Sequence, residues 1–280
     1  MINIIKLIRI KQWVKNLFIL VPLFFSQSLF NKESLLKSFI TLIGFCLITS
    51  SVYILNDIID IEKDKLHPVK KNRPLASGKI SIKLAVILLI LLFTTGMILM
   101  LILTNKILVI CVLIYVILNI LYSLILKNLQ SFDLITLASF FVIRVFIGAT
   151  AIGVDVSSWL IICTFTIALF LGTGKRYIEL VKHGISSRKV LNNYSKEFLI
   201  YTLYLSSFSS IVFYALFCLT KGLYYEFSVI PVVGGFLMYF LKLFKNEINE
   251  DPSIVFLKEK SILIYLIIWA VLIFLLTYVL

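Results

Sequence analysis

Three aspartates follow a long apolar segment at a spacing that suits a bound cation. Asp57, Asp60 and Asp64 stand at i, i+3 and i+7, so a helix would present their carboxylates on one face, with Asn56 beside them. Burying each charge at a membrane-helix end costs about 2.5–3.5 kcal/mol on insertion scales. A divalent cation offsets this cost, and Mg²⁺ prefers hard oxygen ligands together with substrate phosphates. The alternative is a solvated acidic helix cap.

The loop after the aspartates carries the cations that a bound phosphate needs. His67, Lys70 and Arg73 follow within a few residues, and arginine can bind phosphate through two parallel hydrogen bonds. A metal on the aspartates would bridge diphosphate oxygens while these cations bind the remaining charge. The alternative is a positive loop that only sets membrane topology, which explains Lys79 and Lys83 better than it explains Arg73.

A second charged segment, about 174–196, follows the sixth apolar span. Lys175, Glu179 and Lys182 lie at i, i+4 and i+7, with Arg176 adjacent. One interpretation is a Lys175–Glu179 pair on a helix face. The functional interpretation is an anion site at the mouth of a helical bundle, facing the first loop.

Isolated polar residues near the apolar spans are further candidates. Arg144 lies near the middle of the fifth span, where a charge usually faces a cavity or a partner, so a site is favoured over a structural ion pair. Tyr122 and Lys127 follow the fourth span, and Asp133 begins the fifth. Lys127 could be topological and Asp133 a helix N-cap, or both could point into the same cavity. The spacing does not decide between these readings.

The composition is that of a polytopic membrane protein. Hydrophobic residues make up 61% of the 280 and charged residues 15%, and apolar segments long enough to cross a bilayer recur along the chain. These segments lack the alternation that a membrane barrel requires. We therefore predict a single all-α domain over 1–280. The nine expected spans are about 17–30, 35–55, 82–104, 106–126, 132–153, 158–179, 197–220, 226–244 and 261–279.

The net charge of +13 reflects membrane orientation and does not indicate nucleic-acid binding. Of the 27 lysines and arginines, only Lys32, Lys37, Lys106 and Lys221 fall on the side opposite the N-terminus, and Arg144 lies within a span. This bias predicts a cytoplasmic N-terminus and an external C-terminus. Residues of about 3–16 mix cations with apolar side chains, as an interfacial helix does. A cleaved signal peptide is the alternative for this end of the chain.

The ordered motifs resemble a known family. Asn56-Asp57-x-x-Asp60-x-x-x-Asp64 resembles the first aspartate-rich motif of the UbiA superfamily of intramembrane prenyltransferases. The resemblance implies a nine-helix bundle with a Mg²⁺-dependent phosphate site open to the cytoplasm and to lipid. The family's second aspartate-rich motif is absent, and Gly174-Lys175-Arg176-Tyr177-x-Glu179 stands in its place. With the run from Arg9 to Asn16, this is similar to the phosphoribosyltransferase branch of the superfamily.

That branch implies a reaction and a set of site residues. The donor would be phosphoribosyl diphosphate and the acceptor a polyprenyl phosphate, in the bacterial cytoplasmic membrane with the active site facing the cytoplasm. The alternatives are a conventional prenyltransferase that acts on an aromatic acceptor, which predicts a second acidic pair, and an anion transporter. Asp57, Asp60 and Asp64 would bind Mg²⁺ and act in catalysis with Asn56. The expected substrate-binding residues are Gln12, Lys15, His67, Lys70, Arg73, Tyr122, Lys127, Arg144, Lys175, Arg176 and Glu179.

Overall fold

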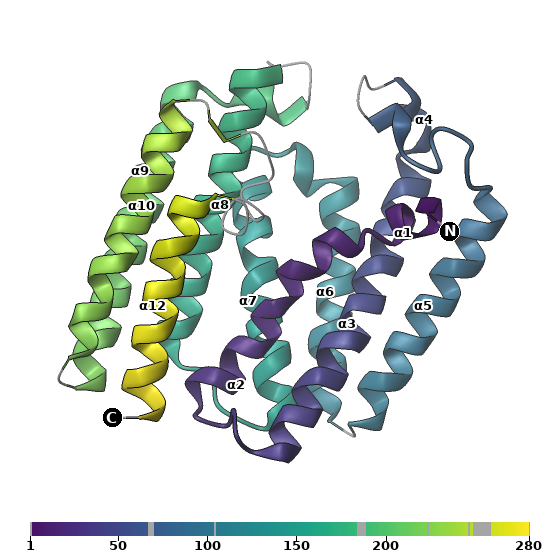
Figure 1. Ribbon diagram of the computed structural model, residues 1–280. Helices are drawn as coiled ribbons and strands as arrows, with labels where there is room; N and C mark the ends of the chain where they lie inside the picture. The colour runs from purple at the N-terminus through teal and green to yellow at the C-terminus, as the bar shows by residue number, and fades with distance from the viewer. Residues whose placement is uncertain are drawn as a thin grey trace. The chain divides into compact units, whose positions relative to one another are not determined.

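The computed structural model describes residues 2–66, 70–103, 105–183, 189–222, 224–245, 247–248 and 259–279, and all regular elements within these ranges are helices (Figure 1). The α-helices are α1 (Ile2–Ile8), α2 (Val21–Phe25), α3 (Lys32–Ile59), α4 (Ile61–Leu66), α5 (Ile82–Ile102), α6 (Lys106–Leu124), α7 (Phe132–Ile152), α8 (Ser158–His183), α9 (Lys196–Lys221), α10 (Val229–Phe244) and α12 (Lys260–Tyr278). The 3₁₀ helices are η1 (Ile10–Leu20), η2 (Lys70–Asn72), η3 (Leu126–Asn128), η5 (Lys189–Asn193) and η6 (Tyr225–Ser228).

Within these described ranges, eight helices are long and apolar enough to cross a membrane. They coincide with the second to the ninth predicted spans, so the prediction of a polytopic helical membrane protein is confirmed. The first predicted span, about 17–30, is not among the eight. It forms the end of η1 and the short helix α2, which has Pro22 in its first turn. The helical part of that predicted span, residues 17–25, rises only about 16 Å, which is shorter than a bilayer crossing.

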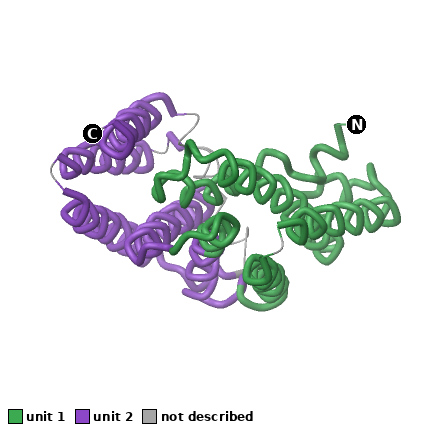
Figure 2. Tube along the Cα trace, turned by 90° about the horizontal axis from the view of Figure 1, so that it is seen from below, with its two compact units in different colours: residues 1–126, 143–155 green, residues 127–142, 156–280 purple. Residues whose placement is uncertain are grey.

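The chain divides into two compact units (Figure 2). Unit 1 comprises residues 1–126 and 143–155, and unit 2 comprises residues 127–142 and 156–280. Helix α7 is shared, because its first half belongs to unit 2 and its second half to unit 1.

In unit 1, α3 is the central helix and packs closely along α5. Its start is capped by Asn31, whose side-chain oxygen accepts a hydrogen bond of 3.0 Å from the Ser34 amide. Gly44 and Gly96 face each other across the helix pair, and a Cβ on Gly96 would collide with Ile48 and with the Gly44 carbonyl. Small residues that let helix backbones approach are typical of membrane helix pairs. This packing fixes α3, which carries the aspartates at its end.

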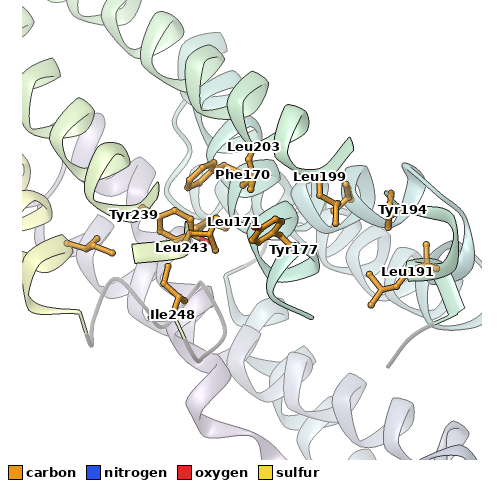
Figure 3. Packing of buried hydrophobic residues seen from close by; sticks show 13 residues of the cluster. Phe170, Leu171, Tyr177, Leu191, Tyr194, Leu199, Leu203, Tyr239, Leu243 and Ile248 are labelled. Carbon is orange, nitrogen blue, oxygen red and sulfur yellow. The ribbon is translucent and has the colours of Figure 1, made fainter. Parts of the chain in front are cut away.

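In unit 2, a cluster of buried apolar side chains joins α8, η5, α9 and α10 (Figure 3). Phe170 of α8 lies against Tyr239 of α10, with ring centroids 4.7 Å apart. Gly174 of α8 leaves room for the Tyr239 hydroxyl, which a Cβ at that position would strike. The cluster therefore holds the last turns of α8, where the second charged segment begins.

The expected N-terminal helix over 3–16 is divided in two. Helix α1 ends at Ile8, Arg9 adopts a left-handed backbone with φ of 57°, and η1 begins at Ile10. Its interfacial position stays a prediction. The four cysteines are free, and Cys46 and Cys218 are buried as small core residues.

Candidate functional site

The three aspartates lie on either side of a bend between α3 and α4. Asp57 is in the last turn of α3, Asp60 at the junction, and Asp64 on α4. The Asp60 amide donates to the Asn56 carbonyl at 3.0 Å and the Asp64 amide to the Asp60 carbonyl at 2.8 Å. Because this i to i−4 pattern crosses the bend, the expected common face survives for Asp57 and Asp64.

Asp57 and Asp64 meet at one arginine. Nη1 of Arg73 lies 3.0 Å from Oδ1 of Asp57 and 2.6 Å from Oδ2 of Asp64. Arg9 forms a second ion pair with Asp57. The two carboxylates are buried, whereas the side chain of Arg73 is 31% exposed and that of Arg9 is 25% exposed. We call these four residues the aspartate cluster; it is a buried anionic pair that is covered by accessible guanidinium groups.

The aspartate cluster suits a bridging cation because one nitrogen atom contacts both carboxylates. Asp60 lies apart from it: its side chain is 21% exposed and is 3.8 Å from Nζ of Lys63. Among the residues that the structure describes, no three His, Cys, Asp or Glu side chains converge into a full metal cage. Mg²⁺ usually binds one or two protein carboxylates and takes its remaining ligands from phosphate oxygens and water, and a pair of carboxylates fits this coordination.

Further predicted residues of unit 1 lie at the end of α3, at the end of α6, on η1 and on η2. Asn56 accepts a hydrogen bond of 2.8 Å from Ser123 of α6, the neighbour of half-buried Tyr122. Three more of these residues are also half-buried. They are Gln12 and Lys15 on η1 and Lys70 on η2; His67 lies outside the described residues.

Arg144 is 3% exposed and lies within a polar network of unit 1. Its Nε donates to Oδ1 of Asn16 at 2.9 Å, and its Nη2 donates to the Tyr115 hydroxyl at 3.0 Å. The guanidinium also lies over the Tyr115 ring, 5.1 Å from the centroid. The charge within the span therefore connects α7 to η1 and α6. A direct contact with substrate stays a prediction.

Arg176 forms a second cluster, in unit 2. Its Nε and Nη2 bind the two oxygens of Asp133 at 2.6 and 2.9 Å, and its Nη1 binds Glu179 at 2.8 Å. The Arg176 side chain is 1% exposed and that of Asp133 is 0% exposed. We call these three residues the Arg176 cluster. Glu179 thus pairs with Arg176, and the two other predicted cations of this unit, Lys127 and Lys175, are half-buried.

Arg9 and Tyr194 are among the site-forming residues that were not predicted from the sequence. Arg9 pairs with Asp57 and lies over the Tyr53 ring at 5.0 Å; its place in the basic N-terminal run was the available signal. Tyr194, after η5, accepts a hydrogen bond of 3.0 Å from the Ser131 amide. Burial raises the pKa of the Tyr194 phenol. No periodicity in the sequence marks that bond.

The fold and these clusters define a polytopic membrane protein with an arginine-covered carboxylate site at the end of a central helix. The UbiA prenyltransferase family model matches residues 19–267. The chain therefore belongs to the UbiA prenyltransferase family.

Named relatives resemble the chain over nearly its full length. The decaprenyl-phosphate phosphoribosyltransferase of Corynebacterium glutamicum is 29% identical, covering 95% of this chain and 84% of that protein. The protein of the same name from Mycolicibacterium smegmatis is also 29% identical, covering 95% of this chain and 90% of its own. Among solved structures, a UbiA homologue from Archaeoglobus fulgidus bound to GPP and Mg²⁺ gives a TM-score of 0.74 at 18% identity, covering 99% and 100% of the two chains.

Proposed function

We propose that this protein transfers 5-phosphoribosyl from phosphoribosyl diphosphate to a polyprenyl phosphate and releases diphosphate. The observation that carries the proposal is the aspartate cluster, in which buried Asp57 and Asp64 share a cation position beneath Arg73 and Arg9. Membership of the UbiA family supports a transferase, and the relatives named above support this donor and acceptor.

Mg²⁺ is the proposed metal, held by Asp57 and Asp64 with Asp60 at the edge of the site. When bound, it would neutralise charge on the diphosphate leaving group. The geometric support is that a single Arg73 nitrogen already contacts both carboxylates. The solved relative from Archaeoglobus fulgidus was bound to GPP and Mg²⁺.

The cations of unit 1 would bind the donor phosphates. Arg73 and Arg9 are accessible and already lie beside the carboxylates, and Lys70 follows α4 in the same loop. An acceptor phosphate oxygen attacks C1 of the ribose on the face opposite the diphosphate. The bond from C1 to the diphosphate oxygen breaks, and its electron pair leaves with the diphosphate. The attacking phosphate is already ionised, so the reaction needs no strong general base.

In unit 2, we assign Lys175 and Lys127 to substrate phosphate and give Arg176 a supporting part. Arg176 binds Asp133 through a two-nitrogen fork and is 1% exposed, so it holds the α7 start against α8. Lys175, one residue before it, is half-buried, and its ammonium is a compact charge suited to a phosphate.

The location that we propose is the bacterial cytoplasmic membrane, with the site facing the cytoplasm. The positive-inside bias assigns the N-terminal segment to that side. In this proposal the η1–α2 segment leads from the cytoplasmic face to the opposite face of the membrane, and the later spans alternate in direction. Helices α3 and α8 would then both end on the cytoplasmic side. A conventional prenyltransferase is the second candidate, because the family name and the GPP-bound solved relative both favour prenyl transfer.

The deciding experiment is a transfer assay with purified protein. It combines Mg²⁺, polyprenyl phosphate and radiolabelled phosphoribosyl diphosphate, and measures label in the organic phase. Asp57→Asn should abolish labelling, whereas the same substitution at exposed Asp155 should leave it unchanged. One outcome would replace the proposal with a conventional prenyltransferase. In that outcome, label passes from a prenyl diphosphate to an aromatic acid, and none passes from phosphoribosyl diphosphate to polyprenyl phosphates of any length.

A further inference from the structure

The N-terminal 3₁₀ helix η1 is unusually long. It runs for 11 residues, whereas 3₁₀ runs beyond three or four residues are uncommon. A 3₁₀ helix has three residues per turn, so side chains three apart eclipse one another. Trp13, Asn16 and Ile19 therefore form one row along η1.

Each member of this row is bound to a neighbouring helix of unit 1. Nε1 of Trp13 donates to Oγ of Ser50 on α3 at 3.0 Å. Nδ2 of Asn16 reaches two further α3 side chains, Oγ1 of Thr49 at 3.0 Å and Sγ of Cys46 at 3.2 Å. The Ile19 backbone lies against α7 at a position where only glycine fits, because a Cβ on residue 148 would collide with it.

The row runs antiparallel to α3. Trp13 contacts Ser50, and Asn16 contacts Thr49 and Cys46, which are three residues apart on α3. Asn16 therefore bridges neighbouring turns of α3, and η1 is held to this helix at two successive positions.

The middle of η1 is the most firmly held point, and Arg9 stands at its start. Asn16 is 1% exposed and also accepts the hydrogen bond from buried Arg144. Tyr115 binds the same guanidinium, so Arg144 cannot follow a displaced Asn16 without breaking a second bond. From Asn16 toward Arg9, the contacts of the chain with α3 move toward the last turn of α3. At Arg9 the contact is with Asp57. The left-handed backbone at Arg9 separates η1 from α1 there.

We propose that η1 is a rigid spacer: its Asn16–Arg144 bond holds Arg9 against Asp57, and Arg9 serves as a fixed cation of the diphosphate site. Asn16 and Arg144 are then positioning residues. The inference deepens the proposed function and rests on it for the identity of the anion. It predicts two effects of opposite sign, because Arg9 competes with metal ions for Asp57 and attracts phosphate.

The test measures binding of Mn²⁺ alone and of inorganic diphosphate with Mn²⁺, using full-length protein in lipid nanodiscs. Arg9→Gln should tighten Mn²⁺ binding about tenfold and weaken diphosphate binding about tenfold, as expected when one charged contact is lost. Asn16→Leu should give the same pair of shifts. A residue with a merely structural role would weaken both ligands together, so that pattern in Asn16→Leu would overturn the proposal.

A double variant tells whether Asn16 acts through Arg9. The two residues lie about 14 Å apart along a 3₁₀ helix, a separation at which independent effects add. The combined Arg9→Gln and Asn16→Leu variant should show no more than the shifts of Arg9→Gln alone. Additive shifts would contradict the spacer. Leu17→Ala, on the exposed side of the same helix, is the matched control and should leave both affinities unchanged.

Conservative variants keep the test interpretable. Asn16→Asp retains the oxygen that accepts from Arg144 and removes the amide donor to Thr49 and Cys46, so it tests the Arg144 bond alone. It should keep the wild-type affinities, and loss of diphosphate binding there would count against the inference. Asn16→Ala, which adds no bulk, takes the place of Asn16→Leu where the latter does not fold. Because neither ligand contains ribose or lipid, these affinities stand even where the labelling assay shows no phosphoribosyl transfer, so the two proposals fail separately.

Discussion

The aspartate cluster and the Arg176 cluster contain the same chemistry in two different settings. In each, one guanidinium joins two carboxylates: Arg73 joins Asp57 to Asp64, and Arg176 joins Asp133 to Glu179. The Arg73 side chain is 31% exposed and contacts Asp57 and Asp64 through a single nitrogen atom. The Arg176 side chain is 1% exposed and uses three nitrogen atoms.

The difference separates an exchangeable cluster from a permanent one. Arg73 belongs to the loop after α4 and its side chain is partly exposed, so another cation can take the position of its Nη1. Arg176 belongs to a 26-residue helix whose neighbouring turns are fixed by the apolar cluster of unit 2. Breaking a buried ion pair leaves an uncompensated charge, whereas an accessible pair contributes little to folding. Residue type alone therefore does not tell a ligand site from a structural pair.

The sharpest contrast is expected from removing each arginine, beginning with Arg176. Arg176→Met should lower the free energy of unfolding by about 3–5 kcal/mol, because fully buried Asp133 keeps its charge without its partner. Chemical unfolding in detergent measures this. Adding Asp133→Leu should recover most of the loss; no recovery would show that the cluster is not a self-contained pair.

Arg73→Gln should affect activity more than stability. Loss of one preorganised donor to a developing charge costs roughly 10²–10³ in kcat, or about 2.7–4 kcal/mol in the activation barrier. The free energy of unfolding should fall by less than in Arg176→Met, by about 1–2 kcal/mol, because Arg9 still pairs with Asp57 and the replacement amide can still donate to buried Asp64. Rates and unfolding curves of one preparation measure both. A large loss of stability with normal kcat would reverse our assignment of the two clusters.

Tyr194→Phe tests the surroundings of the Arg176 cluster. The change removes the acceptor of the Ser131 amide and should cost about 1 kcal/mol of stability. Because the folded-state pKa of Tyr194 is raised above the value of about 10 in the unfolded chain, the unfolded state loses its proton first. The contribution of Tyr194 is therefore complete below pH 10 and declines as the pH rises further. The variant should lack this decline, which unfolding curves recorded at several alkaline pH values would reveal.

Glu179→Gln should have the smallest effect. Glu179 is the more accessible acid of the Arg176 cluster, at 19% exposed, and its amide replacement keeps an acceptor for Nη1 of Arg176. We expect a loss of about 0.5 kcal/mol in unfolding experiments. The same substitution type at Asp133, to Asn, should cost several times more. Equal costs would mean that burial is not what distinguishes the two acids.

The sequence was sufficient for the eight long helices and insufficient for the contacts and for the N-terminal segment. Membrane-length apolar runs are set by local composition, so eight of the expected spans, including α3, could be located from hydropathy. The spacing of Asp57 and Asp64 predicted a shared face because neighbouring turns of a helix determine it. The partner of Arg176 could not be read in this way, since Asp133 precedes it by 43 residues. The 3₁₀ form of η1 was also missed, because contacts with α3 and α7 stabilise it.

The close approach of Ile19 to Gly148 has a consequence for biosynthesis. The bond from Asn16 to Arg144 next to it joins residues 128 positions apart. At about 5–20 residues per second, the ribosome needs roughly 6–26 s to make the intervening chain. The η1 segment therefore docks on α3 first and acquires its partners on α7 only later. Until α7 inserts, α3 alone holds η1, and the anchor at Arg144 is added in a second step.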